Sequence, residues 1–521
     1  MTRRQPLPFL PAAAILLLVL SAPGLGSADG EAGGRAALGR PDGPLSPAAL
    51  RAATARLMEF GPRPVGAAGH DDAASYVGGR FLLGGLKPIL TDTFPCPAPS
   101  GRPPNGGPPS GDAVCGSVVA LAHALPLADA WSLMKGEAEA FTFAHPPRPD
   151  LEAALAQAAE DEGVSRLTPF DVFKRPSPLF PRAVVRCLLR RLVRREAGDD
   201  AEVPTTRAAV AADMLRRLAR AHEAVLVVAP LDMRPAPGAG DHGADESASL
   251  VVLCGLAEHV VCASPRPRTR TLVCAALDGH WRGAAGARSL AAMLGPADDR
   301  VSRGGAQMPR AGADADNRAA GAETRRAAIG EPSEDVQLAG LLGPSEAAAR
   351  AEALAETLEA RPEDADVVAE AEDVLVRLLR LEPYRVRLVV CLDLSSDGEA
   401  LAVHLASAGG EEGAAHRGWL AAAVRRAEER SRTPFSGGTA GAGDTASAGE
   451  AAAGHAQTAL AARGRPVLLL QTAGAPRDRW FTAGDTVQRM DAAALSVQAR
   501  AVAALVEEIL AAETLSAGDN F

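Results

Sequence analysis

Four short apolar runs constrain the fold of this chain more than any other feature. They are residues 224–229 (AVLVVA), 270–277 (RTLVCAAL), 386–392 (VRLVVCL) and 467–470 (VLLL). Runs of this length without polar alternation are typical of strands buried on both faces of a sheet. Amphipathic helical patterns alternate with them, at 248–260, 286–294 and 491–512. The alternation predicts an α/β fold with a mixed, mostly parallel central sheet flanked by helices.

Two further helices are predicted near the N-terminus. Residues Pro47 to Phe60 carry apolar side chains at helical spacing, and Ser46 directly before them is a suitable N-cap. A second helix is expected from Asp71 to Leu86, after a Gly-Pro-Arg-Pro turn.

The first 28 residues have the order of a secretory signal. Arg3 and Arg4 precede an apolar core at 12–20, and small residues follow around 26–28. The apolar run is shorter than the roughly 20 residues that a membrane-spanning helix needs. We therefore expect an exported protein, periplasmic, in the cell envelope or secreted, with an uncleaved membrane anchor as the alternative. No later stretch of the sequence is long and apolar enough to span a bilayer.

Composition shifts divide the rest of the chain. The expected divisions are a disordered linker at 29–45, an N-terminal part of the core at 46–115, a large and partly helical insertion at 116–220, and the main core at 221–515 with low-complexity loops at 299–335 and 432–458.

Charge and motifs exclude several classes of protein. The formal net charge is −10 and no sustained basic stripe is present, so a nucleic-acid partner is not expected. The most basic stretch, 186–195 (RCLLRRLVRR), is interpreted as the solvated face of a helix. The sequence has no GxxxxGK[ST] phosphate loop, and 395–398 (SSDG) lacks the GxSxG pattern of a hydrolase nucleophile.

Several short segments, taken in order, resemble the M28 family of zinc aminopeptidases. Residues 61–66 (GPRPVG) with Gly69-His70 are similar to the GPRPxGSxG start of secreted members, and 227–232 (VVAPLD) is similar to the strand that ends in HxD. Residues 243–249 (GADESAS) resemble GADDNASG, and 277–287 (LDGHWRGAAGA) resembles FDGEEQGLLGS.

Two later segments complete the resemblance. Residues 391–394 (CLDL) are similar to NLDM, and 481–486 (FTAGDT) are similar to HTxxDT. The family implies a zinc-aminopeptidase-like three-layer sandwich and a site for two zinc ions, here interrupted by a large insertion.

Carried over residue by residue, the resemblance implies that much of the metal site is gone. Two carboxylates at family ligand positions are retained, Asp245 and Asp393. Three ligand positions hold residues that cannot bind zinc, namely Pro230, Trp281 and Phe481. Two carboxylates without imidazole ligands are not expected to hold zinc tightly, so no cofactor is expected.

Two other positions matter for this interpretation. His280 stands at the family's general-base position, and Asp232 stands where the family orients the first zinc-binding histidine. A rebuilt site that uses His242, Asp245, His280 and Asp393 is an alternative, because a cluster of imidazoles and carboxylates can bind a metal or transfer protons.

Three functions are consistent with these features. The favoured one is an exported, catalytically inactive pseudopeptidase that keeps the fold to bind a peptide or protein. The second is an active zinc-dependent aminopeptidase with a rearranged metal site, which would hydrolyse peptides with zinc as cofactor. The third is an envelope assembly module that acts through the insertion at 116–220. The sequence favours a non-catalytic protein but leaves enzymatic activity open.

Overall fold

A computed structural model of the chain describes most of the predicted core. It describes residues 43–95, 114–125, 204–233, 243–294, 345–379, 383–398, 400–406, 411–436, 458–461, 465–475 and 482–512, together with residues 342, 456, 477 and 515. The expected signal at 1–28, the linker at 29–45 up to residue 42 and the loop at 299–335 lie outside this part of the chain.

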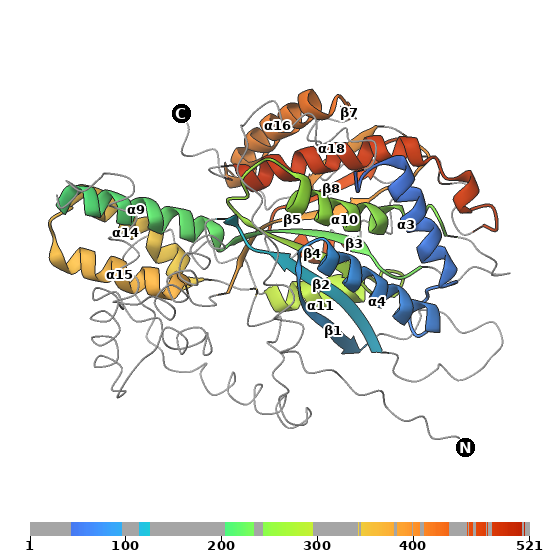
Figure 1. Ribbon diagram of the computed structural model, residues 1–521, viewed down its shortest axis with the longest axis horizontal. Helices are drawn as coiled ribbons and strands as arrows, with labels where there is room; N and C mark the ends of the chain where they lie inside the picture. Colours follow the sequence, from blue (N-terminus) through green and yellow to red (C-terminus); the bar gives the residue numbers. More distant parts are fainter. Residues whose placement is uncertain are drawn as a thin grey trace, which may run out of the picture.

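Eight strands of the described part form one mixed sheet, seen nearly edge-on in Figure 1. They are β1 (Lys87–Pro95), β2 (Val114–Ala122), β3 (Glu223–Pro230), β4 (Thr271–Leu277), β5 (Arg385–Asp393), β6 (Leu401–Ala406), β7 (Phe435–Ser436) and β8 (Val467–Thr472). Their order is β1-β2-β4-β3-β5-β8-β6-β7. The central strands β4, β3, β5 and β8 are mutually parallel, and β2 and β6 flank them in the antiparallel direction. The predicted mixed, mostly parallel sheet is therefore confirmed.

Helices cover both faces of the sheet and create two hydrophobic cores. One face is covered by α3 (Pro47–Glu59), α4 (Ala68–Leu83), α10 (Ala248–Glu258), α16 (Glu411–Ser431) and α18 (Ala492–Ala511). The other is covered by α11 (Ala285–Leu294), and its core continues at one end of the sheet among α9 (Pro204–Ala221), α14 (Glu346–Ala360) and α15 (Ala365–Leu379). Because β3 and β4 are buried along nearly their whole length, they need the uninterrupted apolar sequence from which they were predicted.

The helix signals in the sequence correspond to observed caps. The side chain of Ser46 accepts a hydrogen bond from the backbone N–H of Ala49, which satisfies one of the free donors at the start of α3. Asp491 caps α18 in the same way through Ala493 and Ala494. The predicted helices at 47–60 and 491–512 are confirmed to within one residue, whereas the helix predicted at 71–86 is α4, which begins and ends three residues earlier.

The structure differs from the prediction at both ends of the stretch 116–220. Its first residues belong to β2, which pairs with β1 and β4, and its last residues form α9, which leads directly into β3. Residues 126–203 lie outside the described part of the chain. Strand β2, with the sequence VCGSVVALA, was not predicted because Gly116 and Ser117 interrupt its apolar run.

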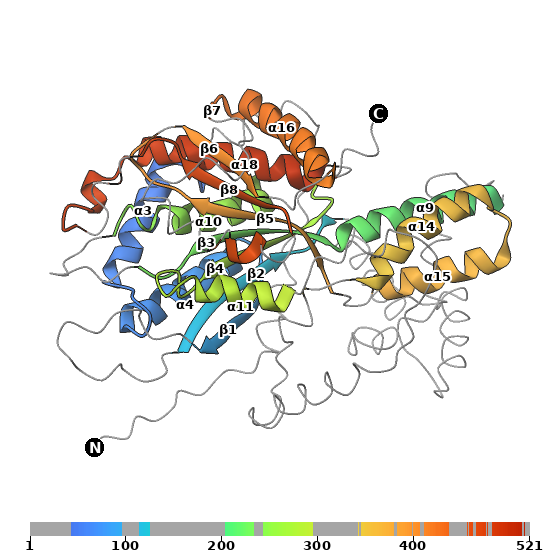
Figure 2. The same ribbon diagram turned by 180° about the vertical axis from the view of Figure 1, so that it is seen from behind.

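Three of the helices project from one end of the sheet. Helices α9, α14 and α15 pack against one another and extend away from the strands, which Figures 1 and 2 show from opposite sides. We call these three helices the helical arm. No helix in the described residues is long and apolar enough to cross a membrane.

Candidate functional site

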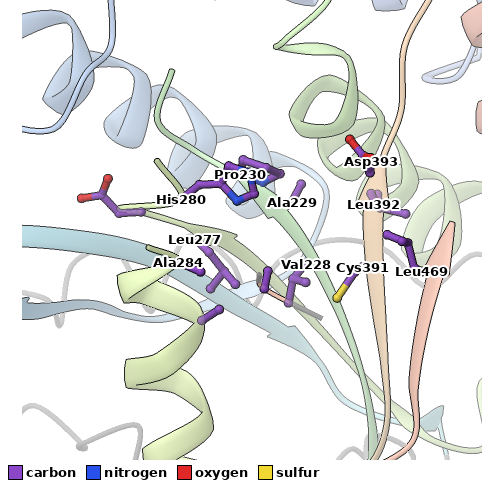
Figure 3. A pocket seen from close by; sticks show the side chains of 13 residues that line it. Val228, Ala229, Pro230, Leu277, His280, Ala284, Cys391, Leu392, Asp393 and Leu469 are labelled. Carbon is purple, nitrogen blue, oxygen red and sulfur yellow. The ribbon is translucent and has the colours of Figure 1, made fainter. Parts of the chain in front are cut away.

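A small open pocket lies where the parallel strands β3, β4 and β5 end. Its volume is about 420 Å³, counting the solvent at its mouth. Most of its lining is apolar, and Figure 3 shows Val228, Cys391 and Leu469 on neighbouring strands, with Asp393 further along β5. Pro230 and His280 also line it. Ligands of open α/β sheets bind beyond the carboxyl ends of the parallel strands, so this pocket is the candidate binding site.

Asp245 is held by the turn that follows β5. One carboxylate oxygen accepts a hydrogen bond from Oγ of Ser395 over 2.6 Å, and the other accepts one from the backbone N–H of Ser396. The backbone N–H of Asp245 donates to the carboxylate of Asp485 over 2.7 Å. Asp245 is 1% exposed. Both of its oxygens are therefore used by the protein itself.

Asp393, at the end of β5, forms an ion pair. The guanidinium of Arg477 donates to its carboxylate over 2.7 Å and to its backbone carbonyl over 3.1 Å. The side-chain amide of Gln471 donates to the same carboxylate oxygen over 3.0 Å. Asp245 contacts the turn that directly follows Asp393, so the two retained carboxylates lie on either side of residues 394–396. Neither Arg477 nor Ser395 was identified from the sequence, where 395–398 was noted only for lacking the GxSxG pattern.

Asp232 accepts hydrogen bonds from the turn that carries His280 and Trp281. The backbone N–H of His280 donates over 2.8 Å and that of Trp281 over 3.4 Å. Burial, together with the nearby negative charge of Asp278, raises the pKa of Asp232 to about 7. This carboxyl group therefore positions the turn of His280 and Trp281. The family resemblance had led us to expect that it orients a zinc-binding histidine, and Pro230 stands at that histidine's position.

The turn after β4 is tightly built. Gly279 and Gly283 have positive φ values of 67° and 68°, and Ala284 has a φ of 55°. A side chain at position 279 would meet Ala285 and the sulfur of Cys115 at about 3 Å, so only glycine fits there. The rings of His280 and Trp281 meet edge to face, with centroids 5.0 Å apart. The turn therefore presents His280 to the pocket in a defined position.

A buried pair that sequence reasoning did not assign lies behind this turn. Nε2 of His70 is 2.9 Å from Oδ1 of Asp278, and Oδ2 of Asp278 accepts from the backbone N–H of Gly116 over 2.7 Å. Burial lowers the pKa of His70, but the hydrogen bond and charge of Asp278 outweigh it, so the pKa is raised overall. His70 belongs to the Gly-His pair that carried part of the family resemblance, which was the only available signal.

Arg63, from the Gly-Pro-Arg-Pro turn, ties α3 to the loop of Asp245. It is 1% exposed and donates to Oγ of Ser247 over 2.6 Å and to the carbonyl of Leu57 over 3.2 Å. Burial lowers its pKa to about 10, so it stays charged near neutral pH. The motif that resembles the family start is thus a structural anchor for the site.

The described residues contain no group of three or more His, Cys, Asp or Glu side chains placed to hold a metal ion. His242 and Phe481 lie outside the described part of the chain, so the structure does not test the site that would include His242.

Comparisons with known proteins find similarity in structure only. No family model matches the sequence, and no curated protein matches it. Among solved structures, the glutaminyl cyclase of Fimbriiglobus ruber aligns at 12% identity and a TM-score of 0.41, over 89% of this chain and 96% of that one.

Two peptidase structures align with comparably low identities and TM-scores. A Zn-dependent exopeptidase from Parabacteroides distasonis aligns at 11% identity and a TM-score of 0.38, over 89% of this chain and 98% of that one. The LapA aminopeptidase of Legionella pneumophila aligns at 8% identity and a TM-score of 0.39, over 95% of this chain and 79% of that one. With identities and scores this low, the likeness assigns neither an activity nor a substrate.

Proposed function

We propose that this chain is an exported, M28 peptidase-like pseudopeptidase that uses its fold to bind a peptide or protein. The observation that carries the proposal is the ion pair between Asp393 and Arg477. A metal-binding carboxylate directs its lone pairs at a cation, and here an arginine of the same chain supplies that cation. The charge of Asp393 is therefore balanced without zinc.

The second retained carboxylate supports the same conclusion. Both oxygens of Asp245 accept protein hydrogen bonds, from Ser395 and Ser396. A carboxylate that bridges two zinc ions directs one oxygen at each ion, whereas the two oxygens of Asp245 here face donors of the same chain. With proline at 230 and tryptophan at 281, the residues present do not fit a zinc pair, and we route no chemistry through one.

The pocket that remains is suited to binding. Its wall is mostly apolar, and the partly exposed His280 is one of its few polar residues. Asp393 also lines the pocket, but its charge is balanced by the ion pair with Arg477. An apolar slot with few polar groups favours an apolar side chain of a peptide or protein ligand. Export follows from the signal-like residues 1–28 and is part of the proposal.

Metal content and activity decide between this proposal and an active enzyme. The purified full chain, prepared with zinc and dialysed, is analysed for bound metal and assayed on aminoacyl chromogens. A glutaminyl peptide is included, because one similar fold is a glutaminyl cyclase. We expect zinc far below one ion per chain and no product from either substrate. Stoichiometric zinc with product formation that a chelator abolishes would establish the active zinc enzyme instead.

Binding is tested separately from inactivity. Peptides with varied apolar side chains are screened against immobilised protein, and binders are measured again with His280→Ala and with Arg282→Ala. Both residues lie in the same turn, but only His280 lines the pocket. We expect about tenfold weaker binding for His280→Ala, as loss of one good contact implies, and no change for Arg282→Ala. Equal binding by both variants would mean that the ligand does not bind in the pocket. It would favour the alternative function, an envelope assembly module that acts through the stretch 116–220.

A further inference from the structure

A cluster of two imidazoles and a tyrosine lies at the opposite end of the sheet from the pocket, where the helical arm begins. His222 is the single residue between α9 and β3, and Tyr384 directly precedes β5. Leu342, three residues before the cap of α14, forms a β-bridge with Tyr384. His123 directly follows β2. Each described connection between the sheet and the arm therefore passes through or beside this cluster.

His222 joins the arm to the sheet through backbone and side chain. Its carbonyl accepts from the N–H of Arg385, and its Nε2 bonds the carbonyl of Leu378 in the last turn of α15. A carbonyl only accepts, so Nε2 carries the proton and Nδ1 is the bare nitrogen of a neutral ring. The ring is 0% exposed, and Nδ1 has no hydrogen-bond partner among the described residues.

Tyr384 connects the two histidines. Its ring stacks on His222 with centroids 5.3 Å apart and an interplanar angle of 19°. Its hydroxyl lies 2.7 Å from Nδ1 of His123. Burial raises the pKa of Tyr384, so the hydroxyl stays protonated while it shares this hydrogen bond with His123. The cations Lys87 on β1 and Arg268 before β4 lower the pKa of His123 through their charge, and the imidazole of His222 acts in the same direction.

We propose that the cluster of His123, His222 and Tyr384 is an acid-sensitive joint, which holds the helical arm against the sheet while both imidazoles are neutral and releases it when they are protonated. This device is separate from the pocket and does not depend on the proposed binding function. The geometry that carries it is the position of the cluster at the root of the arm, with a buried Nδ1 that has no acceptor for a second proton.

Both histidines resist protonation while the joint is closed. Burial, reinforced by Lys87, lowers the pKa of His123 to about 3, and burial lowers the pKa of His222. In an open joint each ring is expected to return towards the ordinary value of 6.5. A lowered pKa in the closed state means that closure is fully favoured above pH 6.5 and weakens as the pH falls. Below that pH the ratio of open to closed molecules rises by up to about tenfold per pH unit for each imidazole.

Hydrogen exchange on the full chain tests the joint. Protection factors, corrected for the intrinsic pH dependence of exchange, are measured at pH 7 and pH 5 for peptides covering 371–388. Peptides from α18 serve as the internal reference. We expect protection at the end of α15 and the start of β5 to fall at least tenfold at pH 5, with α18 unchanged.

Variants distinguish opening of the joint from a general loss of stability of the protein at low pH. His222→Phe keeps a ring to stack on Tyr384 but cannot be protonated, and His123→Gln keeps an acceptor for the hydroxyl. In the double variant the pH 7 to pH 5 ratio should be close to one, even if both values are lowered by a less stable arm. His404→Gln, on β6 away from the cluster, should retain the wild-type ratio. An undiminished fall in the double variant, or no fall in the wild type, would overturn the proposal.

Discussion

Arg477 lies with its guanidinium 2.7 Å from the carboxylate of Asp393, and both side chains are only 10% exposed. The pair joins two residues 84 positions apart, at the edge of the sheet that borders the pocket. Arg477 also donates to the backbone carbonyl of Asp393, so it fixes the end of β5 as well as its charge. This relationship explains how the buried carboxylate of Asp393 is stabilised in the folded protein.

Replacing Arg477 should destabilise the protein without creating a metal site. Arg477→Ala leaves Gln471 as the one remaining hydrogen-bond partner of the Asp393 carboxylate among the described residues, at a cost of about 2–3 kcal/mol in the free energy of unfolding. Arg477→Lys keeps the positive charge but not the planar guanidinium geometry, so it should lose less than Arg477→Ala. Urea unfolding measures both. The double variant Arg477→Ala/Asp393→Asn should lose clearly less than the sum of the single losses, and full additivity would show that the pair contributes nothing.

The Asp245 contact predicts a structural rather than a catalytic effect of mutation. Asp245→Asn places an amide donor near Ser395 or Ser396 and should lower the free energy of unfolding by about 2 kcal/mol. Ser395→Ala should cost about 1 kcal/mol. A double-mutant cycle from urea unfolding is expected to show coupling near 1 kcal/mol, while metal content stays unchanged. If Asp245→Asn kept full stability but removed bound zinc, the carboxylate would be a metal ligand after all.

The sheet could be predicted from the sequence wherever strands are buried on both faces. The runs at 224–229 and 270–277 allow no solvent-facing side chains, and they became β3 and β4. The outer strands were not predicted. β1 contains two prolines and several polar residues, which oppose an interior strand but are tolerated at an edge, and β6 is short with alternate residues partly exposed.

The site was predictable only as far as local motifs reach. The segments around Asp245 and Asp393 led us to expect the two carboxylates at one edge of the sheet, and the structure brings Asp245 to the turn after Asp393. What the carboxylates now bind could not be predicted. Arg477 is far from Asp393 in sequence, and no pattern marks an arginine with a positive φ of 51° as its partner. The role of Asp232 was hidden for the same reason, because it binds backbone N–H groups, which every residue possesses.

The raised pKa of Asp232 predicts a pH-dependent contribution to stability. The folded value is about 7 and the ordinary value is 3.8, so the folded state binds the extra proton between these pH values. A raised pKa in the folded state stabilises the fold, and this contribution is fully present when the pH is below the ordinary pKa of the group. The contribution is lost as the pH rises through about 7. The amide in Asp232→Asn does not titrate, so the variant does not lose this stability. Its free energy of unfolding relative to that of the parent should therefore rise by about 2–3 kcal/mol from pH 4.5 to pH 7.5.

Urea unfolding at several pH values measures this difference. Asp213→Asn is the control, because that carboxylate is 47% exposed on α9. A constant difference for Asp232→Asn would mean that the carboxyl group is ionised throughout, like an ordinary aspartate.

Two glycines give opposite predictions for the same substitution. At Gly286, near the start of α11, a Cβ would lie 2.4 Å from the carbonyl oxygen of Asp278 and 3.1 Å from Oγ of Ser117. The helix and the turn after β4 therefore approach too closely for any side chain, and Gly286→Ala should cost several kcal/mol, about 3 or more. At Gly418, exposed in α16, a Cβ would meet nothing within 4 Å. Gly418→Ala should stabilise by about 0.5–1 kcal/mol, because alanine loses less backbone entropy in a helix. Thermal and urea unfolding of the two variants would show opposite shifts of the midpoint. Similar small effects at both positions would mean that α11 does not rest on Asp278, and the turn that presents His280 to the pocket would lose its support.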